Sequence, residues 1–382
     1  MKQIRIMELR GTYKGGGGPD KTILLSAAKH DRKRFFVLVT YLRDPKDDDF
    51  QIGDMARKYG VPDYVEVLDR SMLDFRCLFQ LHSLLRCHKL TIIHVHDQKT
   101  TLLGFLLKIL NPRIKVMSTA HGWIVNSRLD SLKKKIQLTI LKSFPLHIAV
   151  SKATENLMLD AGFRPESIKM LYNSIDINTW KRTNGSGTLL KRELGIAPEA
   201  MVIGSIGRLS QEKDLITFLR VAKNILVKSP DIIFLIVGDG KGSEIGQELL
   251  NEAKSLAIEK SLFFLGHRTD LMNIYGVLDL FLMTSLTEGL PNTVLEAMAM
   301  EVPIVSTAVG GVPEIVEHLK TGTLCNVGDV EGITKSVEEL LQNSLTRDKF
   351  TANGRALILE KFSFDGRLEA IEKIYVNLAE RI

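Results

Sequence analysis

The sequence predicts an α/β protein built from two doubly wound halves. Short apolar runs of strand length alternate with helical stretches, and this alternation occurs twice along the chain. The chain has 382 residues, which exceeds the length at which a single hydrophobic core keeps growing, so two domains are expected. Hydrophobic residues make up 45% of the chain, a share that excludes a largely disordered protein.

The first half is predicted to form a sheet from short, mostly apolar runs. These runs are separated by helical stretches, as the strands of a parallel sheet are. The predicted strands cover residues 4–9, 35–41, 64–68, 90–96, 115–119 and 146–150. A change in the pattern comes near Asp176.

The second half is predicted to begin after a polar, glycine-containing linker at residues 178–187. Further apolar runs predict strands at residues 201–206, 232–237, 262–265, 277–283 and 303–306. A last helical stretch, residues 364–381, is compatible with packing on either half. The chain contains no short repeat and no low-complexity segment.

Cysteine content and hydropathy exclude several classes of protein. Cys77, Cys87 and Cys325 form no CxxC pair, so neither a disulfide framework nor a zinc ribbon is indicated, and a reducing compartment is the simpler inference. The N-terminal residues lack the apolar core of a signal peptide, and no apolar run reaches the length of a membrane span. We therefore expect a cytoplasmic protein that is not integral to a membrane.

Positive charge is concentrated in residues 99–142. This segment contains nine Lys or Arg residues and one acidic residue, Asp130, so its charge is 9 − 1 = +8, whereas the rest of the chain carries 6 − 8 = −2. Apolar residues recur there at helical spacing around a run of three lysines, as Leu129, Leu132, Ile136 and Ile140 around Lys133, Lys134 and Lys135.

The pattern of residues 99–142 is compatible with two interpretations. A helix lying on an anionic membrane has this pattern, and so does a packed helix with a solvated lysine face. A nucleic-acid partner is not expected, because the segment contains Trp123 but no aromatic series for stacking bases and no known nucleic-acid-binding motif.

The most informative motif is EGLPNTVLE at residues 288–296, where Glu288 and Glu296 flank a Gly-Pro turn that leads into an apolar helix. The motif follows the predicted strand at 277–283, so it is expected at the carboxyl end of a parallel sheet, where open α/β folds bind ligands. Free N–H groups at the helix start suit an anion, and the carboxylates suit sugar hydroxyl groups. The alternative is a capped helix with two surface glutamates.

Two further segments have the composition of phosphate-binding sites. Four glycines at 15–18 follow the first predicted strand and precede a helix expected around Lys21, which lets backbone approach a phosphate without Cβ clash. Arg208 and Lys213 follow the strand at 201–206, where fixed cations can stabilise charge on a departing phosphate. The alternatives are a flexible surface turn and surface salt bridges.

Three histidines lie at or near predicted strand ends. His121 directly follows the strand at 115–119, where ligands are met in such folds, although a lone histidine is usually structural. His94 and His96 are expected to point to the same side of one strand, with Asp97 beside them. This pair lacks a third metal ligand at recognisable spacing, so no metal site is predicted.

These motifs together resemble the family 4 glycosyltransferases, which are retaining, nucleotide-sugar-dependent enzymes with the GT-B fold. The resemblance covers nearly the whole chain, and its strength lies in the order of the motifs. They are GGGGPDKT at 15–22, TAHG at 119–122, YNSID at 172–176, GRLSQEK at 207–213, VGDG at 237–240, EGLPNTVLE at 288–296 and GGVPEI at 310–315.

The resemblance implies two Rossmann-like domains facing a cleft. Residues 1–176 would form the acceptor-side domain, residues 177–365 the nucleotide-sugar-binding domain, and a C-terminal helix at 366–382 would pack back on the first domain. The expected reaction is transfer of a hexose-type unit, with retention of configuration, to a glycan or lipid-linked acceptor in surface polysaccharide or glycolipid assembly. No metal or other cofactor is implied.

The resemblance also implies roles for individual residues. The expected catalytic residues are His121, which would donate a hydrogen bond to the donor sugar, Glu288 at the sugar hydroxyls, and Arg208 and Lys213 at the diphosphate. Glu296 would bind the ribose. The donor site would be completed by Gly16, Gly17, Gly207, Gly238, Arg268, Gly289, Leu290, Pro291, Asn292 and Thr293.

Three other functions are compatible with parts of this pattern. A non-catalytic nucleotide-sugar or glycan-binding module is the main alternative, since fold alone does not determine function. A nucleotide-sugar epimerase can share the two-domain architecture. A nicotinamide-dependent dehydrogenase is disfavoured, because the glycine loop does not follow GxGxxG.

Overall fold

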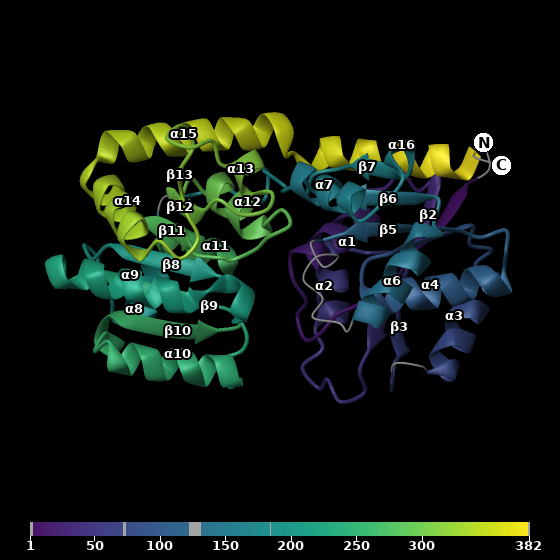
Figure 1. Ribbon diagram of the computed structural model, residues 1–382, viewed down its shortest axis with the longest axis horizontal. Coiled ribbons are helices and arrows are strands. Elements are labelled where there is room, and N and C mark those ends of the chain that lie inside the picture. Colours follow the sequence, from purple (N-terminus) through teal and green to yellow (C-terminus); the bar gives the residue numbers. More distant parts are fainter. Residues whose placement is uncertain (1–2, 72–73, 122–130, 184, 381–382) are drawn as a thin grey trace. The chain divides into compact units, whose positions relative to one another are not determined.

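A computed structural model shows the chain divided into two compact units (Figure 1). Unit 1 contains Met1–Asn173 together with Asp365–Ile382, and unit 2 contains Ser174–Phe364. The sequence analysis placed the two boundaries after residues 176 and 365. The structure describes residues 3–71, 74–121, 131–183 and 185–380, with the side chains of 131–134 left out.

Unit 1 is built on a seven-stranded sheet whose strand order is β3-β2-β1-β4-β5-β6-β7. All neighbouring strands pair in parallel, as in the register that places Glu8 beside His94. The strands are β1 (Ile4–Gly11), β2 (Phe35–Arg43), β3 (Tyr64–Leu68), β4 (Ile92–Val95), β5 (Lys115–Ala120), β6 (Leu146–Ala149) and β7 (Ile168–Met170).

Helices cover both faces of the unit 1 sheet, because successive side chains of each strand point to opposite faces. Met7 lies in a core with α3, α4, α6 and α7, whereas its neighbour Ile6 lies in a core with α1, α2 and α16. The helices are α1 (Gly18–Lys29), α2 (Ile52–Tyr59), α3 (Phe75–Cys87), α4 (Gln98–Leu110), α6 (Ser131–Lys142), α7 (Lys152–Asp160) and α16 (Phe364–Glu380). A 3-10 turn, Pro165–Ser167, precedes β7.

Unit 2 repeats this plan with a six-stranded parallel sheet in the order β10-β9-β8-β11-β12-β13. Its strands are β8 (Val202–Ile206), β9 (Ile233–Val237), β10 (Leu262–Gly266), β11 (Leu280–Met283), β12 (Ile304–Thr307) and β13 (Thr323–Cys325). Three of the four inner strands, β8, β11 and β12, are buried at every residue, as expected for a sheet covered on both faces.

The helices of unit 2 surround its sheet (Figure 1). One core packs α9, α10, α14 and α15 against the strands around Phe218 and Phe234. The helices are α8 (Thr188–Glu193), α9 (Leu215–Lys228), α10 (Glu244–Ser255), α11 (Leu271–Val277), α12 (Asn292–Ala299), α13 (Val312–Ile315), α14 (Val330–Gln342) and α15 (Ser344–Lys361). Two 3-10 turns, Gln211–Lys213 and Glu259–Ser261, complete the unit.

Most predicted strands coincide with observed ones, and the differences have local causes. The apolar run at 277–283 was predicted as one strand, but its first residue closes helix α11 and only Leu280–Met283 is a strand. Strands β7 and β13 were not predicted. Each is three residues long and lies at a sheet edge, so neither has the apolar run on which the prediction depended.

The C-terminal helix α16 belongs to the core of unit 1. Ile371, Tyr375 and Leu378 are buried on it and lie in the same cluster as Ile6 of β1. Arg367 on the same helix donates a hydrogen bond from Nε to the carbonyl of Tyr172 at 3.1 Å. This helix therefore covers the central strands of the first sheet.

Helix α6 packs differently from the predicted apolar face. Of that face, Ile140 packs against the core while Ile136 is exposed, and the core also receives Leu141, with Leu138 packed against it. Leu129 lies outside the described residues, and the structure gives no side-chain placement for Leu132, Lys133 or Lys134. Among the described residues, no helix combines the length and the apolar character that crossing a membrane requires.

Candidate active site

The strand orders of both sheets create a switch point beside the first strand of each unit. In unit 1, β1 is followed by β2 on one side of the sheet, whereas β4 is followed by β5 on the other side. In unit 2, β8 and β9 lie on one side and β11 and β12 on the other in the same way. Open α/β sheets bind ligands at the carboxyl ends of such strand pairs. The predicted site residues follow β1 and β5 in unit 1 and mainly β8 and β11 in unit 2.

Close backbone approach at the ends of β8 and β9 explains Gly207 and Gly238. A Cβ atom added to Gly238 would lie 1.8 Å from the carbonyl oxygen of Gly207. The N–H of Gly207 donates to the carbonyl of Val237 at 2.8 Å. These two predicted donor-site glycines therefore hold together the loops that follow the two strands.

Lys213 and Glu288 form an ion pair at the carboxyl end of β11. Lys213 Nζ donates to Glu288 Oε1 at 2.6 Å, and Ser285 Oγ donates to the same oxygen at 2.7 Å. Both side chains are partly exposed, at 24% for Lys213 and 12% for Glu288. Since Glu288 Oε2 has no hydrogen-bond partner among the described residues, it is available to a ligand.

The loop after β11 is anchored on both sides of Glu288. Thr284 Oγ1 donates to the carbonyls of Lys213 and Asp214 at 3.1 and 2.9 Å. Gly310 has a positive φ of 52°, and a Cβ atom there would lie 1.8 Å from the carbonyl oxygen of Glu288. The GRLSQEK, EGLPNTVLE and GGVPEI motifs are therefore parts of one structure, although they are far apart in the sequence.

Two polar atoms in the EGLPNTVLE motif are buried without a partner. Helix α12 begins at Asn292 with Pro291 as its N-cap, as the predicted turn into a helix required. Asn292 Oδ1 and Thr293 Oγ1 have no hydrogen-bond partner among the described residues. Because buried polar atoms are rarely left unpaired, these two suit contacts with a bound ligand. Gly289 and Leu290 precede them in the same turn, where Gly289 accepts a hydrogen bond from the N–H of Gly311 at 2.8 Å.

Glu296 and Arg268 have protein partners in the structure. Glu296 is 4% exposed, and its Oε2 accepts a hydrogen bond from the hydroxyl of Tyr275 at 3.0 Å. Arg268 donates to Glu193 and Asp270 through four N–H···O contacts of 2.7–3.3 Å. The hydrogen bonds that Arg268 donates to Asp270 and Glu193 raise its pKa.

Arg208 differs from Arg268 in its surroundings. It follows β8, is exposed, and makes no ion pair within the described part of the chain. Its guanidinium group is therefore available to an anionic ligand, whereas Arg268 would have to give up carboxylate partners.

The glycine loop of unit 1 is held by a buried carboxylate. Asp20 is fully buried and accepts hydrogen bonds from Arg10 Nε at 2.5 Å, Tyr41 at 2.9 Å and the N–H of Gly17 at 2.7 Å. Gly16 has a φ of +67°, and a Cβ atom there would lie 2.6 Å from Asp20. The glycine loop is therefore fixed by hydrogen bonds and close contacts, which disfavours the alternative of a flexible surface turn.

The N–H groups of Gly16 and Gly17, the two glycines expected to contact the donor, already have hydrogen-bond partners. Gly16 N–H donates to the carbonyl of Tyr13 at 2.9 Å, and Gly17 N–H donates to Asp20. Helix α1 also begins at Gly18, earlier than the position around Lys21 that was predicted. A phosphate bound at this loop would therefore have to use groups other than these two N–H donors.

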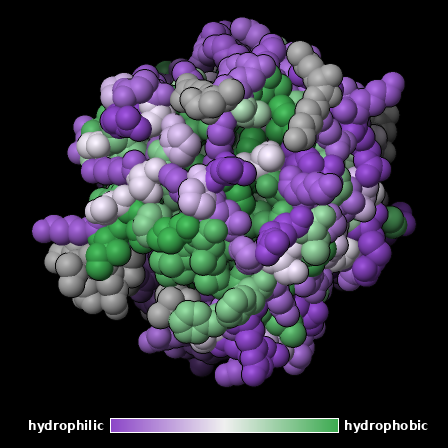
Figure 2. Space-filling view, turned by 90° about the vertical axis from the view of Figure 1, so that its right-hand side faces the viewer, coloured by the Kyte–Doolittle hydropathy of each residue, from purple (hydrophilic) through white to green (hydrophobic). Residues whose placement is uncertain are grey.

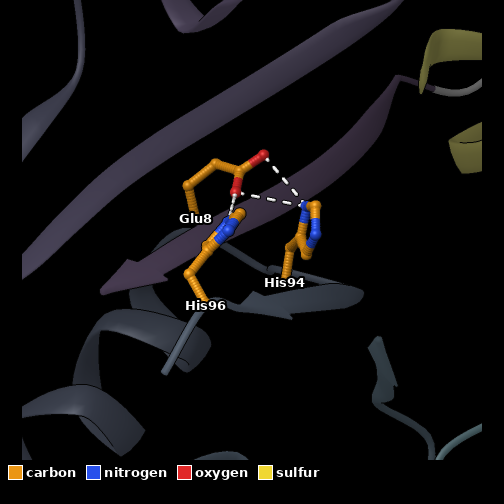
Figure 3. Close-up of side chains that lie close together, drawn as sticks. All are labelled: Glu8, His94 and His96. Carbon is orange, nitrogen blue, oxygen red and sulfur yellow. Dashed lines mark hydrogen bonds and ion pairs between the residues drawn. The ribbon is translucent and has the colours of Figure 1, made fainter. Parts of the chain in front are cut away.

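His121 ends a chain of buried hydrogen bonds that starts at Glu8 on β1. His121 Nε2 lies 3.2 Å from His96 Nδ1, and His96 Nε2 lies 2.6 Å from Glu8 Oε2. Figure 3 shows the Glu8 carboxylate facing both His94 and His96. Burial lowers the pKa of His96 to about 4 and that of His121 well below its usual value, so both are neutral at pH 7.

Glu8 and Tyr375 were not predicted as members of this cluster. Tyr375 of α16 donates to Glu8 Oε1, and its oxygen lies 2.8 Å from His94 Nδ1. His94 Nε2 lies 2.7 Å from Thr119 Oγ1. One signal was present in the sequence, since Glu8 is an acidic residue inside an apolar strand, and such a residue needs buried partners.

Glu8, His94 and His96 are also residue types that could hold a metal ion, and their facing atoms lie within 4.8 Å of one another. Glu8 supplies the third ligand that the sequence analysis did not find. The closest pair, His96 Nε2 and Glu8 Oε2, is at hydrogen-bond distance. We therefore interpret the cluster as a network of hydrogen bonds rather than as a metal site.

Models of two glycosyltransferase families match almost the whole chain. The model described as Glycosyltransferase Family 4 matches residues 17–179, and the model described as Glycosyl transferases group 1 matches residues 188–357. The chain belongs to glycosyltransferase family 4. The resemblance found in the motifs is thereby confirmed, and the protein is an enzyme that transfers a sugar.

Two bacterial proteins are among the curated relatives of this family 4 enzyme. The chain is 26% identical, over 86% of its length and 85% of the relative, to the UDP-Gal:alpha-D-GlcNAc-diphosphoundecaprenol alpha-1,3-galactosyltransferase of Escherichia coli. It is 29% identical, over 76% and 75%, to the N-acetyl-alpha-D-glucosaminyl L-malate synthase of Bacillus anthracis.

Solved structures share the fold of this family 4 enzyme. HepE from Anabaena in complex with UDP-glucose superposes with a TM-score of 0.87 at 22% identity, over 98% of this chain and all of HepE. A glycosyltransferase from Rickettsia africae superposes with a TM-score of 0.84 at 15% identity and full coverage of both chains. The predicted GT-B fold, with two Rossmann-like domains, is confirmed.

Proposed function

We propose that this enzyme transfers a hexose-type unit from a nucleoside diphosphate sugar, with retention of anomeric configuration. The observation that carries the proposal is the grouping of Lys213 and Glu288, with Arg208 exposed after the adjacent strand β8. Cations suit a diphosphate, and a carboxylate suits sugar hydroxyls. The unpaired buried atoms of Asn292 and Thr293 supply further ligand contacts in the same motif.

In the proposed reaction the protein stabilises the leaving group electrostatically. As the sugar departs, negative charge develops on the nucleoside diphosphate, and Lys213 and Arg208 would neutralise it. Lys213 uses one contact for Glu288, and an ammonium group has three donors, so N–H groups remain for phosphate oxygens. We propose that these cations replace a metal ion and that no other cofactor is needed.

The route proposed for retention is a front-side displacement through an oxocarbenium-like state. The departing phosphate would accept the proton of the attacking hydroxyl group. Glu288 would orient the sugar through its free Oε2, while His121 lies at the end of β5 in unit 1. We propose for the donor loop of unit 1 that Gly18, the first residue of α1, contacts the diphosphate in place of Gly16 and Gly17.

A lipid-linked or polysaccharide acceptor is the acceptor class we propose. The Escherichia coli relative is named for a diphosphoundecaprenol acceptor, and a Staphylococcus aureus relative at 23% identity is named for capsular polysaccharide biosynthesis. The basic segment at 99–142 fits an anionic acceptor or membrane surface.

Nucleotide binding should be tested first, by thermal shift with UDP, GDP and ADP, each with magnesium or with a chelator. A ligand at about 100 times its dissociation constant adds roughly 2.7 kcal/mol to stability, which gives a visible shift. We expect one nucleotide to raise the melting temperature equally under both conditions.

The Arg208→Ala variant should bind the selected nucleotide about tenfold more weakly, because it loses a charge-assisted contact. Arg220→Ala is the matched control, since Arg220 is exposed on α9 and pairs with Glu252. A shift that requires magnesium would contradict the metal-independent site, and no shift with any nucleotide would contradict the proposed donor.

We propose that unit 1 also contacts an anionic membrane from the cytoplasmic side. Apolar side chains are exposed on α3, α4 and α6, which neighbour one another in the fold. Phe79 is 72% exposed, and the others are Phe75, Ile109, Leu110 and Ile136. Figure 2 shows apolar surface gathered within a mostly hydrophilic face of the molecule. Apolar side chains together with lysines are what an interfacial protein presents to lipid headgroups.

Vesicle co-sedimentation tests this membrane contact. The double variant Phe75→Ser/Phe79→Ser and the triple variant Lys133→Ala/Lys134→Ala/Lys135→Ala should each partition at least about tenfold less into vesicles that contain anionic lipid. Leu189→Ser, at an exposed position in unit 2, should partition as the wild type does. Equal partition of all four proteins would contradict the proposal.

A further inference from the structure

The buried chain of hydrogen bonds that runs from Glu8 through His96 to His121 is not needed for the fold of a parallel sheet. Glu8, His94 and His96 occupy interior positions on β1, on β4 and just beyond β4, where the neighbouring residues are apolar. Placing a carboxylate and imidazoles there is costly unless all of them are hydrogen-bonded. The cluster therefore needs an explanation beyond packing.

The position of each proton in this chain of hydrogen bonds can be assigned from the groups that can only accept. Glu8 accepts a hydrogen bond from the Tyr375 hydroxyl, and its other oxygen lies 2.6 Å from His96 Nε2. Although burial disfavours its charged form, the neighbouring His94 and His96 keep the pKa of Glu8 well below its usual value. An ionised carboxylate can only accept, so His96 must hold its proton on Nε2.

The same assignment of donors and acceptors determines which ring nitrogen of His121 is protonated. A neutral imidazole has a single N–H, so His96 Nδ1 is left as an acceptor. His121 Nε2 lies 3.2 Å from that atom and must therefore carry the proton of the contact. His121 Nδ1 is then an unprotonated acceptor. It is buried and has no hydrogen-bond partner among the described residues.

We propose that Glu8 and His96 are positioning residues that hold His121 in the tautomer with a free Nδ1, so that His121 accepts a hydrogen bond from a hydroxyl group of the transferred sugar. This inference rests on the proposed function. It reverses the direction of the hydrogen bond that the family resemblance implied. A sugar that places a carboxylate or carbonyl at this point would meet a second acceptor and would be rejected.

The location of His121 agrees with this role. It directly follows β5, which pairs with β4, the strand at the switch point of the first sheet. The ring of His96 stacks near that of His121, with centroids 5.5 Å apart, so both the ring position and the tautomer are restrained. At the other end of this chain of hydrogen bonds, Tyr375 of α16 donates a hydrogen bond to Glu8.

The first test is independent of activity. In the full-length protein with isotope-labelled histidine, long-range nitrogen–proton NMR correlations at pH 7 distinguish protonated from unprotonated ring nitrogens. We expect His121 and His96 to be protonated at Nε2 only, with signals unchanged by added zinc or by a chelator. A proton on His121 Nδ1 would overturn the proposal, and so would loss of these N–H signals when zinc is added.

The second test compares variants of His96 in a transfer assay with the nucleotide sugar selected by thermal shift. His96→Leu removes the acceptor for His121 and should lower kcat/KM about tenfold. His96→Asn places an amide oxygen near the former Nδ1 position and should recover most of the loss. The control is His147→Leu, which removes another buried imidazole, on β6 and outside this chain of hydrogen bonds.

A scan of deoxy-sugar donors completes this test. One deoxy analogue should lose about tenfold in kcat/KM with the wild type and much less with His96→Leu. Equal behaviour of His96→Leu and His147→Leu across the scan would overturn the proposal. If no nucleotide sugar is turned over, the proposed function fails, while the NMR experiment still decides the tautomer.

Discussion

Replacing Lys213 with alanine is expected to lower kcat by about two to three orders of magnitude, the usual effect of removing one group that stabilises developing negative charge. Lys213 is the cation that contacts Glu288 at 2.6 Å, and both lie at the carboxyl edge of the second sheet. The variant loses charge at the leaving phosphate and also frees the Glu288 carboxylate. Steady-state kinetics with the donor chosen by thermal shift should show this loss in kcat.

The control for this variant is Lys228→Ala. Lys228 pairs with Glu338 at 2.9 Å on the surface, so it tests the loss of an exposed ion pair outside the site. Its kcat should be within about twofold of wild type. A Lys213→Ala enzyme that folds, binds nucleotide and turns over at the wild-type rate would contradict the proposed role of the cation.

The second large effect is expected for Gly310→Ala, which should abolish measurable turnover and lower the free energy of unfolding by more than about 2 kcal/mol. Gly310 has a φ of +52°, which alone costs about 1–3 kcal/mol for a residue with a side chain. The added Cβ atom would also lie 1.8 Å from the carbonyl oxygen of Glu288, so one of the two backbone segments must move. Urea unfolding and the transfer assay measure the two effects.

Two glycines allow the strain at Gly310 to be separated from the displacement of Glu288. Gly195 has a φ of +67°, but no atom lies within 4 Å of an added Cβ, so Gly195→Ala should lose stability and keep its activity. Gly242 has neither constraint, and Gly242→Ala should change little. Equal activity of Gly310→Ala and Gly195→Ala would show that Gly310 does not position Glu288.

The regular parts of the fold could be predicted from the sequence because they depend on local patterns. Strands such as β2 and β9 are continuous apolar runs between helical stretches, and their predicted and observed limits agree closely. The prediction was wrong where tertiary position decides the structure. Val277 is apolar and was assigned to a strand, but it closes α11.

Part of the candidate site could also be predicted, because some of its residues are identified by their position after a strand. Arg208, Lys213 and Glu288 follow strands, and the parallel sheet brings the ends of those strands to one edge. The ion pair between Lys213 and Glu288, and the neutralisation of Arg268 by Glu193, depend on side-chain distances that spacing in the sequence does not encode. The hydrogen bonds that the N–H groups of Gly16 and Gly17 donate to Tyr13 and Asp20 are likewise not encoded by spacing in the sequence.

The sequence by itself determined the α/β class, the two doubly wound halves and the family, because periodicity and ordered motifs are local properties of the chain. Only the tertiary structure brought together Glu8, His96, His121 and Tyr375, which come from β1, the end of β4, the end of β5 and the last helix. Parallel pairing sets Glu8 beside His94, and the return of α16 to unit 1 supplies Tyr375. The tautomer of His121 follows from these long-range contacts, since a proton position depends on the partner that each nitrogen meets.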